Sequence, residues 1–355
     1  MQYEIALYPG DGIGAEIVDA AVPIIEALGE KHRFEIETTR YDWGADHYLE
    51  HGILIPEDAP DRLAETDAIL HGATGHPKIP EHQIAEPDGH LRIRNELDQY
   101  LNIRPAILFD GVQSPLRGYN GGDIDIKWYR ENSEGGYINI GGQLERANET
   151  ELAIQSTVFT KKGIARTVRE AFKAASDRSG SITNVTKSNA QKHAPVFWDE
   201  VVEEVAEEYP DVSVGHMFVD AAALHLAQQP EAFDVVVAPN LFSDILTDLT
   251  AALVGGLGVA PSANLNPEDD DVPGMFEPVH GSAPDIAGQG LANPLAIILS
   301  VAMMLDDLDE TQAAQELHDA VAAQLRDETA PRTPDLGGDG TTTDVAEDLK
   351  RRIRS

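Results

Sequence analysis

Short apolar runs that favour strands alternate with helical patterns along most of this chain, and the alternation restricts its fold more than any other feature. Strands are predicted at residues 4–8, 34–39, 68–70, 105–109, 124–129, 181–186, 212–219 and 233–238, and the clearest helices at 15–28, 60–65, 163–177 and 199–208. Strands that alternate with helices are typical of α/β folds. The length of 355 residues suggests about two domains.

Residues 137–160 depart from this alternation. Two extended stretches, Tyr137–Gly142 and Glu151–Phe159, predict a β-hairpin inserted in the α/β pattern. An isolated two-stranded ribbon is only marginally stable in water, so we expect a partner subunit to cover it. After residue 250 the sequence predicts mainly helices, with Gly- and Pro-rich loops at 255–262 and 277–290. The longest apolar run, Leu295–Leu305, is too short to span a membrane and predicts a buried helix.

The chain is strongly acidic, with 62 Asp and Glu against 26 Lys and Arg and a net charge of -36. The acidic residues are spread along the whole sequence, which indicates an acidic surface and argues against nucleic acid as a partner. Such a surface resembles that of proteins from salt-loaded cytoplasms, and halophilic origin is a hypothesis about habitat only. The absence of cysteine excludes disulfides and thiolate chemistry. No basic segment precedes the first strand, so we expect a cytoplasmic protein without a signal peptide.

A helix predicted after the strand at 233–238 carries Asp244 and Asp248 at a spacing of four, which places both carboxylates on one face. Two anions among apolar neighbours are costly unless a cation lies between them, and carboxylate oxygens suit Mg²⁺ or Mn²⁺. The alternative to a metal site is that Asp244 and Asp248 lie on an ordinary solvated face of this helix. Asp220 lies at the end of another predicted strand and is a third candidate metal ligand. Lys187, a basic candidate, lies at the end of yet another predicted strand.

Two glycine-rich turns follow strands near the N-terminus, at residues 10–14 and 71–75. The spacing of Gly10, Gly12 and Gly14 departs from the dinucleotide fingerprint, and no acidic residue ends the next strand. The first turn therefore predicts a tight strand-to-helix connection near a ligand. The second turn could present backbone N–H groups to an anion or could simply close a loop.

Several basic and polar residues lie in or next to apolar segments and are candidates for ligand contacts. Arg94, Arg104 and Arg130 favour a shared anionic ligand, because guanidinium groups bind carboxylates bidentately, although each alone could form a structural ion pair. Tyr137 and Lys187 are the candidates for proton transfer. Asp285 could bind ribose hydroxyls or could cap a following helix.

These motifs together resemble the β-decarboxylating dehydrogenases, the family of isopropylmalate, isocitrate, homoisocitrate, tartrate and D-malate dehydrogenases, and the likeness runs nearly end to end. The stretches that carry it are Gly10-Asp-Gly-Ile-Gly14, Asp98-Gln-Tyr-Leu-Asn-Ile-Arg104-Pro, Arg130-Glu-Asn-Ser-Glu-Gly-Gly-Tyr137, Thr186-Lys187-Ser-Asn189, Asn240-Leu-Phe-Ser-Asp244-Ile-Leu-Thr-Asp248 and Glu277-Pro-Val-His-Gly-Ser-Ala-Pro-Asp285.

The resemblance implies an isopropylmalate dehydrogenase-like, non-Rossmann α/β fold with parallel or mixed sheets. One domain is expected to use both ends of the chain, residues 1–99 and 251–355, and the other to comprise residues 100–250 with a dimer-forming β-arm at about 137–160. The resemblance also implies a homodimer, with tetramers left open, and active sites shared between subunits. Lys187 and Asp220 of one subunit would face the remaining site residues of the other, which are Arg94, Arg104, Arg130, Tyr137, Asp244 and Asp248.

The resemblance further assigns roles to these residues. Asp220, Asp244 and Asp248 would hold Mg²⁺ or Mn²⁺, and Asp220 also counts among the catalytic residues. The three arginines would bind the substrate carboxylates, Lys187 would take the hydroxyl proton and Tyr137 would act as the acid after decarboxylation. The pair Asp285-Ile286 resembles that of NAD-using members. The other residues expected at the cofactor are His280, Gly281, Ser282, Ala283 and Asn293.

The same motifs look most like the tartrate and D-malate dehydrogenase branch. Polar His90 and Arg92 precede Arg94, where isopropylmalate dehydrogenases usually have apolar residues. D-malate and tartrate are therefore the expected substrates, and 3-isopropylmalate remains an alternative. A catalytically silent regulatory subunit is a further hypothesis, although it predicts damaged catalytic positions and those named above are all present.

Overall fold

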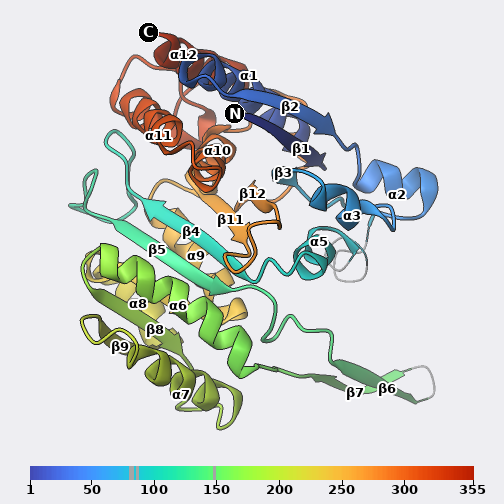
Figure 1. Cartoon of the computed structure of the whole chain (residues 1–355), viewed down its shortest axis with the longest axis vertical. Helices are drawn as coiled ribbons and strands as arrows, with labels where there is room; N and C mark the ends of the chain where they lie inside the picture. The colour runs from blue at the N-terminus through green and yellow to red at the C-terminus, as the bar shows by residue number, and fades with distance from the viewer. Residues whose placement is uncertain (80–83, 85–87, 147–148) are drawn as a thin grey trace. The chain divides into compact units, whose positions relative to one another are not determined.

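The computed structural model of the protein describes residues 1–79, 84, 88–146 and 149–355. The chain divides into two compact units: unit 1 contains Met1–Gln99, Arg104–Ile124 and Ala251–Ser355, and unit 2 contains Tyr100–Ile103 and Asp125–Thr250. Strands and helices alternate in both units (Figure 1), which confirms the predicted α/β class. In the part of the chain that the structure describes, no helix is both long enough and apolar enough to span a membrane.

Unit 1 is built on strands that follow the spatial order β2, β1, β3, β12 and β11. The first four run parallel and β11 is antiparallel to β12. Their bounds are Gln2–Gly10 for β1, Glu35–Arg40 for β2, Ala68–Ala73 for β3, Pro261–Leu265 for β11 and Gly274–Pro278 for β12. Strand β4 (Leu101–Ile107) belongs to both units, since unit 1 resumes at Arg104.

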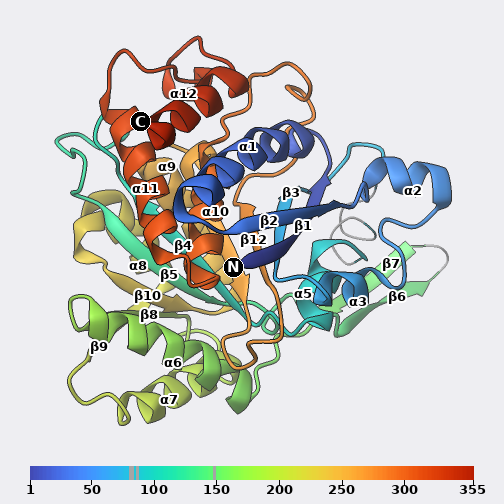
Figure 2. The same ribbon diagram turned by 45° about the horizontal axis from the view of Figure 1, so that its top comes forward.

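The two faces of the unit 1 strands enter different cores, because successive side chains of a strand point to opposite faces. In β1, Ile5 and Leu7 pack in the core formed with α1, α10, α11 and α12, whereas Ala6 and Tyr8 pack with residues of α3 and α5. Figure 2 shows α1 and α12 side by side. The helix bounds are Gly14–His32 for α1, Ala45–His51 for α2, Ala59–Ala64 for α3, His90–Glu96 for α5, Leu295–Asp307 for α10, Thr311–Arg326 for α11 and Thr342–Arg354 for α12.

For the segment after residue 250, one prediction from the sequence is wrong and another is confirmed. Residues 261–265 and 274–278 form β11 and β12, where the sequence predicts helices and loops. Both strands are short and almost wholly buried, so they lack the alternating pattern that identifies a strand. Pro261 begins one strand and Pro278 ends the other, and prolines argue against a strand in sequence. The run 295–305 is the buried helix α10, as predicted.

Unit 2 contains four parallel strands in the order β5, β10, β8 and β9. Helices α6 and α7 pack on this sheet through a core that includes Phe172, Trp198 and Val237. The strand bounds are Asp125–Glu131 for β5, Ser181–Thr186 for β8, Ser213–Phe218 for β9 and Val235–Ala238 for β10. The helix bounds are Lys161–Asp177 for α6, Ala194–Ala206 for α7, Val219–Gln228 for α8 and Asn240–Leu253 for α9.

The predicted hairpin is present as an antiparallel ribbon of β6 (Gly141–Arg146) and β7 (Glu149–Gln155), which projects from the rest of unit 2 (Figure 1). Its apolar side chains are open to solvent, with Leu144 54%, Leu152 50% and Ile154 57% exposed. An uncovered ribbon of two strands has little to stabilise it.

Candidate active site

Three loops meet at the carboxyl ends of the neighbouring parallel strands β1, β3 and β12. The N–H of Asp11 donates to the carbonyl of Ala73 at 2.7 Å, and the N–H of Ile13 donates to the carbonyl of Ser282 at 2.8 Å. Backbone contacts therefore join the turn at 10–14 to the two other loops. The carboxyl ends of parallel strands are where α/β proteins bind ligands.

Glycine is required in the first turn because the backbones approach too closely for a side chain. Gly10 has φ +67°, and a Cβ there would lie 2.0 Å from the carbonyl oxygen of Ala73. Gly12 has φ +57°, and its Cβ would lie 1.9 Å from the carbonyl oxygen of Ser282. These positions confirm the predicted tight strand-to-helix turn.

Asp11 fixes the second glycine turn against the first. Its buried carboxylate accepts hydrogen bonds from the N–H groups of Gly75, at 2.8 Å, and of Ala45, at 2.6 Å. The N–H of Gly75 is thereby used within the protein, which favours the loop-closing role of the 71–75 turn.

The predicted cofactor residues lie in the loop that follows β12 and at the start of α10. The ring of His280 is largely buried, and among the described residues its Nε2 has no hydrogen-bond partner. Burial lowers the pKa of this ring, so it is neutral. Asp285 is exposed in a run of turns at 284–290, so it does not cap a helix. Asn293 donates to Asp335 at 2.9 Å and accepts from the N–H of Leu295 at 3.0 Å.

These features fit a dinucleotide. His280 offers a buried nitrogen without a partner among the described residues, and Asp285 offers an exposed carboxylate for ribose hydroxyls. Gly281, Ser282, Ala283 and Ile286 belong to the same loop.

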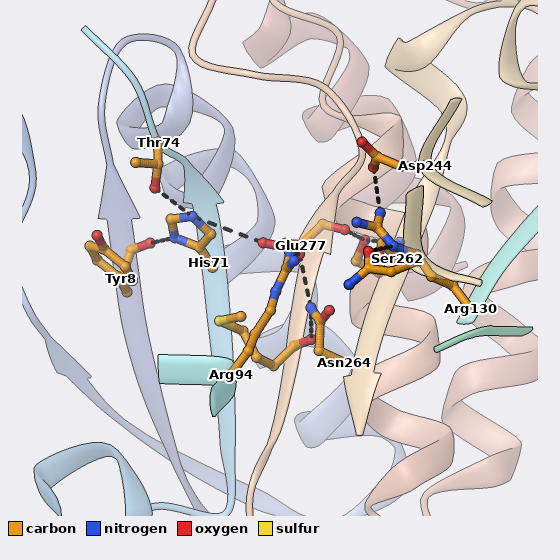
Figure 3. A network of polar contacts seen from close by, with 12 residues as sticks. Tyr8, His71, Thr74, Arg94, Arg130, Asp244, Ser262, Asn264 and Glu277 are labelled. Carbon is orange, nitrogen blue, oxygen red and sulfur yellow. Dashed lines mark hydrogen bonds and ion pairs between the residues drawn. The ribbon is translucent and has the colours of Figure 1, made fainter. Parts of the chain in front are cut away.

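Arg94, from α5, lies in a buried polar network that centres on Glu277 (Figure 3). It donates to a carboxylate oxygen of Glu277, and Asn264 donates to the same oxygen at 2.8 Å. Burial by itself raises the pKa of Glu277, but the positive charge of Arg94, together with His71, His90 and the hydrogen bond from Asn264, outweighs burial and lowers the pKa to about 2. The Nε of Arg94 is buried and has no partner among the described residues, so one donor of this guanidinium is left without an acceptor.

His71 stacks on the ring of Tyr8 beside Glu277, with centroids 4.4 Å apart. Its Nδ1 lies 2.9 Å from the carbonyl of Tyr8, so this nitrogen donates. Its Nε2 then accepts from the hydroxyl of Thr74 at 3.1 Å. Burial lowers the pKa of His71 to about 4, which agrees with a neutral ring. The sequence assigned no role to His71 or Glu277, because their partners are remote along the chain.

In unit 2 the structure brings Arg130, Tyr137 and Asp244 together. Arg130, on β5, donates to Asp244 (Figure 3) and also to the amide oxygen of Asn240 at 2.9 Å. The hydroxyl of Tyr137 donates to the other oxygen of Asp244 at 2.7 Å. Asp248 lies one turn further along α9 and is exposed. Asn240 was not predicted as a site residue, although it begins one of the recognised motifs.

Lys187 and Asp220 form a second pair in unit 2, with Nζ 2.5 Å from Oδ1. The hydrogen bond from Lys187 lowers the pKa of the Asp220 carboxyl. Among the described residues no group of three or more His, Asp or Glu side chains is arranged to hold a metal. The three predicted aspartates are therefore not gathered into one site within the single chain, although their oxygen atoms suit a hard cation. Arg104 lies buried on β4.

A dehydrogenase that acts on an anionic substrate needs a nucleotide site and basic side chains. The chain offers a glycine turn beside the candidate nucleotide residues, buried arginines and a Lys–Asp pair. Comparison with known proteins agrees with this class. Residues 4–349 match the family described as isocitrate/isopropylmalate dehydrogenase, and the chain belongs to that family.

Curated relatives include several decarboxylating dehydrogenases. A protein named "Probable tartrate dehydrogenase/decarboxylase" from Agrobacterium vitis is 45% identical over 98% of this chain and 96% of its own length. The decarboxylating D-malate dehydrogenase of Escherichia coli is 44% identical over 98% of each chain. The 3-isopropylmalate dehydrogenase of Thermobifida fusca is 43% identical over 99% of this chain and 97% of its own length. The crystal structure of isocitrate dehydrogenase from Methylococcus capsulatus matches with a TM-score of 0.90 and 35% identity, covering 99% of this chain and 100% of that one.

The glycine turn can be tested with Gly10→Ala. The substitution combines an unfavourable φ with a backbone clash, so it should lower the free energy of unfolding by more than about 1 kcal/mol. Gly52→Ala is the matched control, since Gly52 has φ +77° but nothing within 4 Å of an added Cβ. Urea unfolding of both variants measures the effect. Equal behaviour of the two variants would contradict the role assigned to the turn.

His71 makes stability depend on pH. A histidine in an unfolded chain titrates near pH 6.5, whereas the pKa of His71 in the folded chain is about 4. Between these values the unfolded chain binds a proton that the folded chain does not. The free energy of unfolding should fall as the pH drops from 6.5 towards 4, by up to about 1.4 kcal/mol per pH unit from this residue. In His71→Leu the dependence should be shallower in urea unfolding at several pH values, and an unchanged slope would disprove the assignment.

Proposed function

We propose that the protein oxidises a (2R)-malate-type hydroxy acid with NAD and a divalent metal, usually with loss of the carboxyl group at C3, and that its substrate is D-malate or tartrate. The observation that carries the substrate class is the polar face of α5. His90 and Arg94 are four residues apart and share that face. Arg92 is directed to Glu96 and to the carbonyl of Glu57. The names of the relatives support the same class.

NAD is the proposed hydride acceptor, and it supplies the oxidation step when it is bound. The exposed carboxylate of Asp285 suits a ribose with two free hydroxyls and would repel the 2′-phosphate of NADP. The buried Nε2 of His280, which has no partner among the described residues, and the adjoining glycine turn at residues 10–14 support the placing of the nucleotide in unit 1.

Asp220, Asp244 and Asp248 are the proposed ligands of Mg²⁺ or Mn²⁺. A divalent cation supplies positive charge that stabilises an alkoxide or enolate oxygen. Because one chain does not gather these carboxylates, we place Asp220 of one subunit with Asp244 and Asp248 of another.

Proton transfers are assigned to Lys187 and Tyr137. Lys187 takes the proton of the substrate hydroxyl while hydride leaves C2, which gives a 2-oxo acid that still carries the carboxyl group at C3. Loss of CO₂ leaves the bonding electrons on the adjacent carbonyl as an enolate, and the phenol of Tyr137 returns a proton to C3. Arg94, Arg104 and Arg130 hold the substrate carboxylates.

A homodimer is the proposed active form. Apolar side chains exposed on unit 2 support it: besides the ribbon β6–β7, Leu224 on α8 is 54% exposed, and on α9 Leu241 is 43% and Ile245 59% exposed. Uncovered apolar patches of this kind mark protein interfaces, and a second copy of the chain would cover them.

The substrate is tested by NADH formation in molar KCl with Mn²⁺. D-malate, L-tartrate, meso-tartrate, 3-isopropylmalate and isocitrate should be compared at equal concentration. We expect D-malate or a tartrate to have the highest kcat/KM, at least about tenfold above 3-isopropylmalate, because a buried polar face binds an isopropyl group poorly. A preference for 3-isopropylmalate would instead indicate a leucine-pathway enzyme. No turnover of any of them by a folded dimer would support the silent subunit.

The dimer is tested with Leu224→Asp, which places a charge on the exposed face of α8. Sedimentation velocity should show a large shift towards monomer, and NADH formation should fall with it because the site needs both subunits. Leu49→Asp in unit 1 is the matched control, since Leu49 is 51% exposed. If Leu224→Asp remains a dimer, or if its monomer retains full activity, the proposed shared site is wrong.

A further inference from the structure

A second polar network lies in unit 2, on strands β8 and β9 and helix α7, and no role has been given to it so far. It extends from the buried Asn184 and Trp198 to the exposed His216 and Glu203. At its centre is Asn184, on β8, which is 0% exposed. Its Oδ1 accepts from the indole N–H of Trp198 at 2.7 Å, and its Nδ2 lies 2.8 Å from Oδ1 of Asp199 and 3.0 Å from Nδ1 of His216.

The hydrogen bonds of Asn184 have one consistent arrangement. The indole of Trp198 can only donate, so the amide oxygen must face it and the amide nitrogen must face Asp199 and His216. Asn184 therefore donates one hydrogen to each of them. Nδ1 of His216 is then an acceptor, and Nε2 donates to Glu203 at 2.7 Å.

The network adds a side-chain contact to strands that a parallel ladder already pairs from Ser181 with Ser213 to Thr186 with Phe218. Asn184 and His216 are directly paired in the register of β8 and β9. Strand β9 ends the strand order of the sheet, and most of its side chains are exposed or only partly buried. Apolar packing therefore contributes little to holding β9, and the bond from Asn184 to His216 adds a directional side-chain contact to the backbone ladder.

The ends of these two strands carry the pair assigned to proton transfer and metal binding. Lys187 follows β8 directly, and Asp220 follows β9 at the second residue of α8. The bond between Asn184 and His216 lies two residues before the last register pair, Thr186 with Phe218. A shift of β9 along β8 would therefore move Asp220 relative to Lys187.

We propose that Asn184 and His216 are positioning residues that hold the end of β9, and with it Asp220, in register with Lys187. This inference rests on the proposed function, because Lys187 and Asp220 matter to catalysis only if they have the roles given above. His216 does not touch substrate in this proposal; its contribution is the acceptor nitrogen Nδ1.

Two substitutions of His216 separate this acceptor from the rest of the ring. The amide oxygen of Asn occupies roughly the position of Nδ1, whereas the amide of Gln reaches the position of Nε2. His216→Asn keeps an acceptor for Asn184 and loses the bond to Glu203. His216→Gln and His216→Leu lose the acceptor. Val214→Ala, two residues earlier on the same face of β9, is the control for packing alone.

Activity and Mn²⁺ binding should be measured on each purified protein in molar KCl, with free Mn²⁺ followed by electron paramagnetic resonance. His216→Gln and His216→Leu should lower kcat and Mn²⁺ affinity by about tenfold or more, because small displacements of catalytic groups are costly. His216→Asn and Val214→Ala should remain within about twofold of the wild type in both, even where Val214→Ala unfolds at a lower temperature.

Wild-type kcat and Mn²⁺ affinity in His216→Gln and His216→Leu would overturn the inference, and so would equal losses in His216→Asn. Lys187→Met separates this result from the proposed function. If Lys187→Met keeps full turnover, the proposed function is wrong whatever the His216 variants show. If Lys187→Met is inactive while every His216 variant matches the wild type, only the positioning role is wrong.

Discussion

The close backbone contact at the ends of β1, β3 and β12 is the constraint on which the unit 1 site depends. Carbonyl groups of Ala73 and Ser282 occupy the space where side chains of Gly10 and Gly12 would project. Because these contacts leave no room for adjustment, the loop with the cofactor candidates is positioned by the same turn that begins α1. Asp11 adds directional bonds to Ala45 and Gly75. The placement of His280 and Asp285 is thus a consequence of backbone geometry more than of their own contacts.

Charge pairing is the second feature common to the candidate site residues. Arg94 is paired with Glu277, Arg130 with Asp244, and Lys187 with Asp220. In a chain with 62 acidic and 26 basic residues, a basic side chain at a site readily finds a carboxylate. On the proposed function, Arg130 and Lys187 become available to an anionic substrate when Asp244 and Asp220 take another cation. Arg94 differs, because its Nη2 is bonded to Glu277 while its buried Nε has no partner among the described residues.

The sequence predicts those parts of the structure whose signal is local. Helix α9 with Asp244 and Asp248, the first glycine turn and the buried helix α10 each follow from spacing or composition within about 15 residues. What it misses depends on partners remote in the chain. His71 pairs with Tyr8 and lies beside Glu277, and nothing in the segment around His71 marks it as a buried neutral ring. The strands β11 and β12 escape prediction for a related reason, since they are defined by pairing rather than by pattern.

Both units place a buried polar residue close to the strand ends that carry site residues. In unit 1, His71 on β3 donates to the carbonyl of Tyr8 on β1, and in unit 2 Asn184 on β8 donates to His216 on β9. The backbone ladder already pairs these strands, and a buried donor that loses its acceptor would cost about 1–3 kcal/mol more. A slip of either strand would incur that cost. These side-chain bonds near the strand ends therefore add to the ladder where the position of site residues matters most.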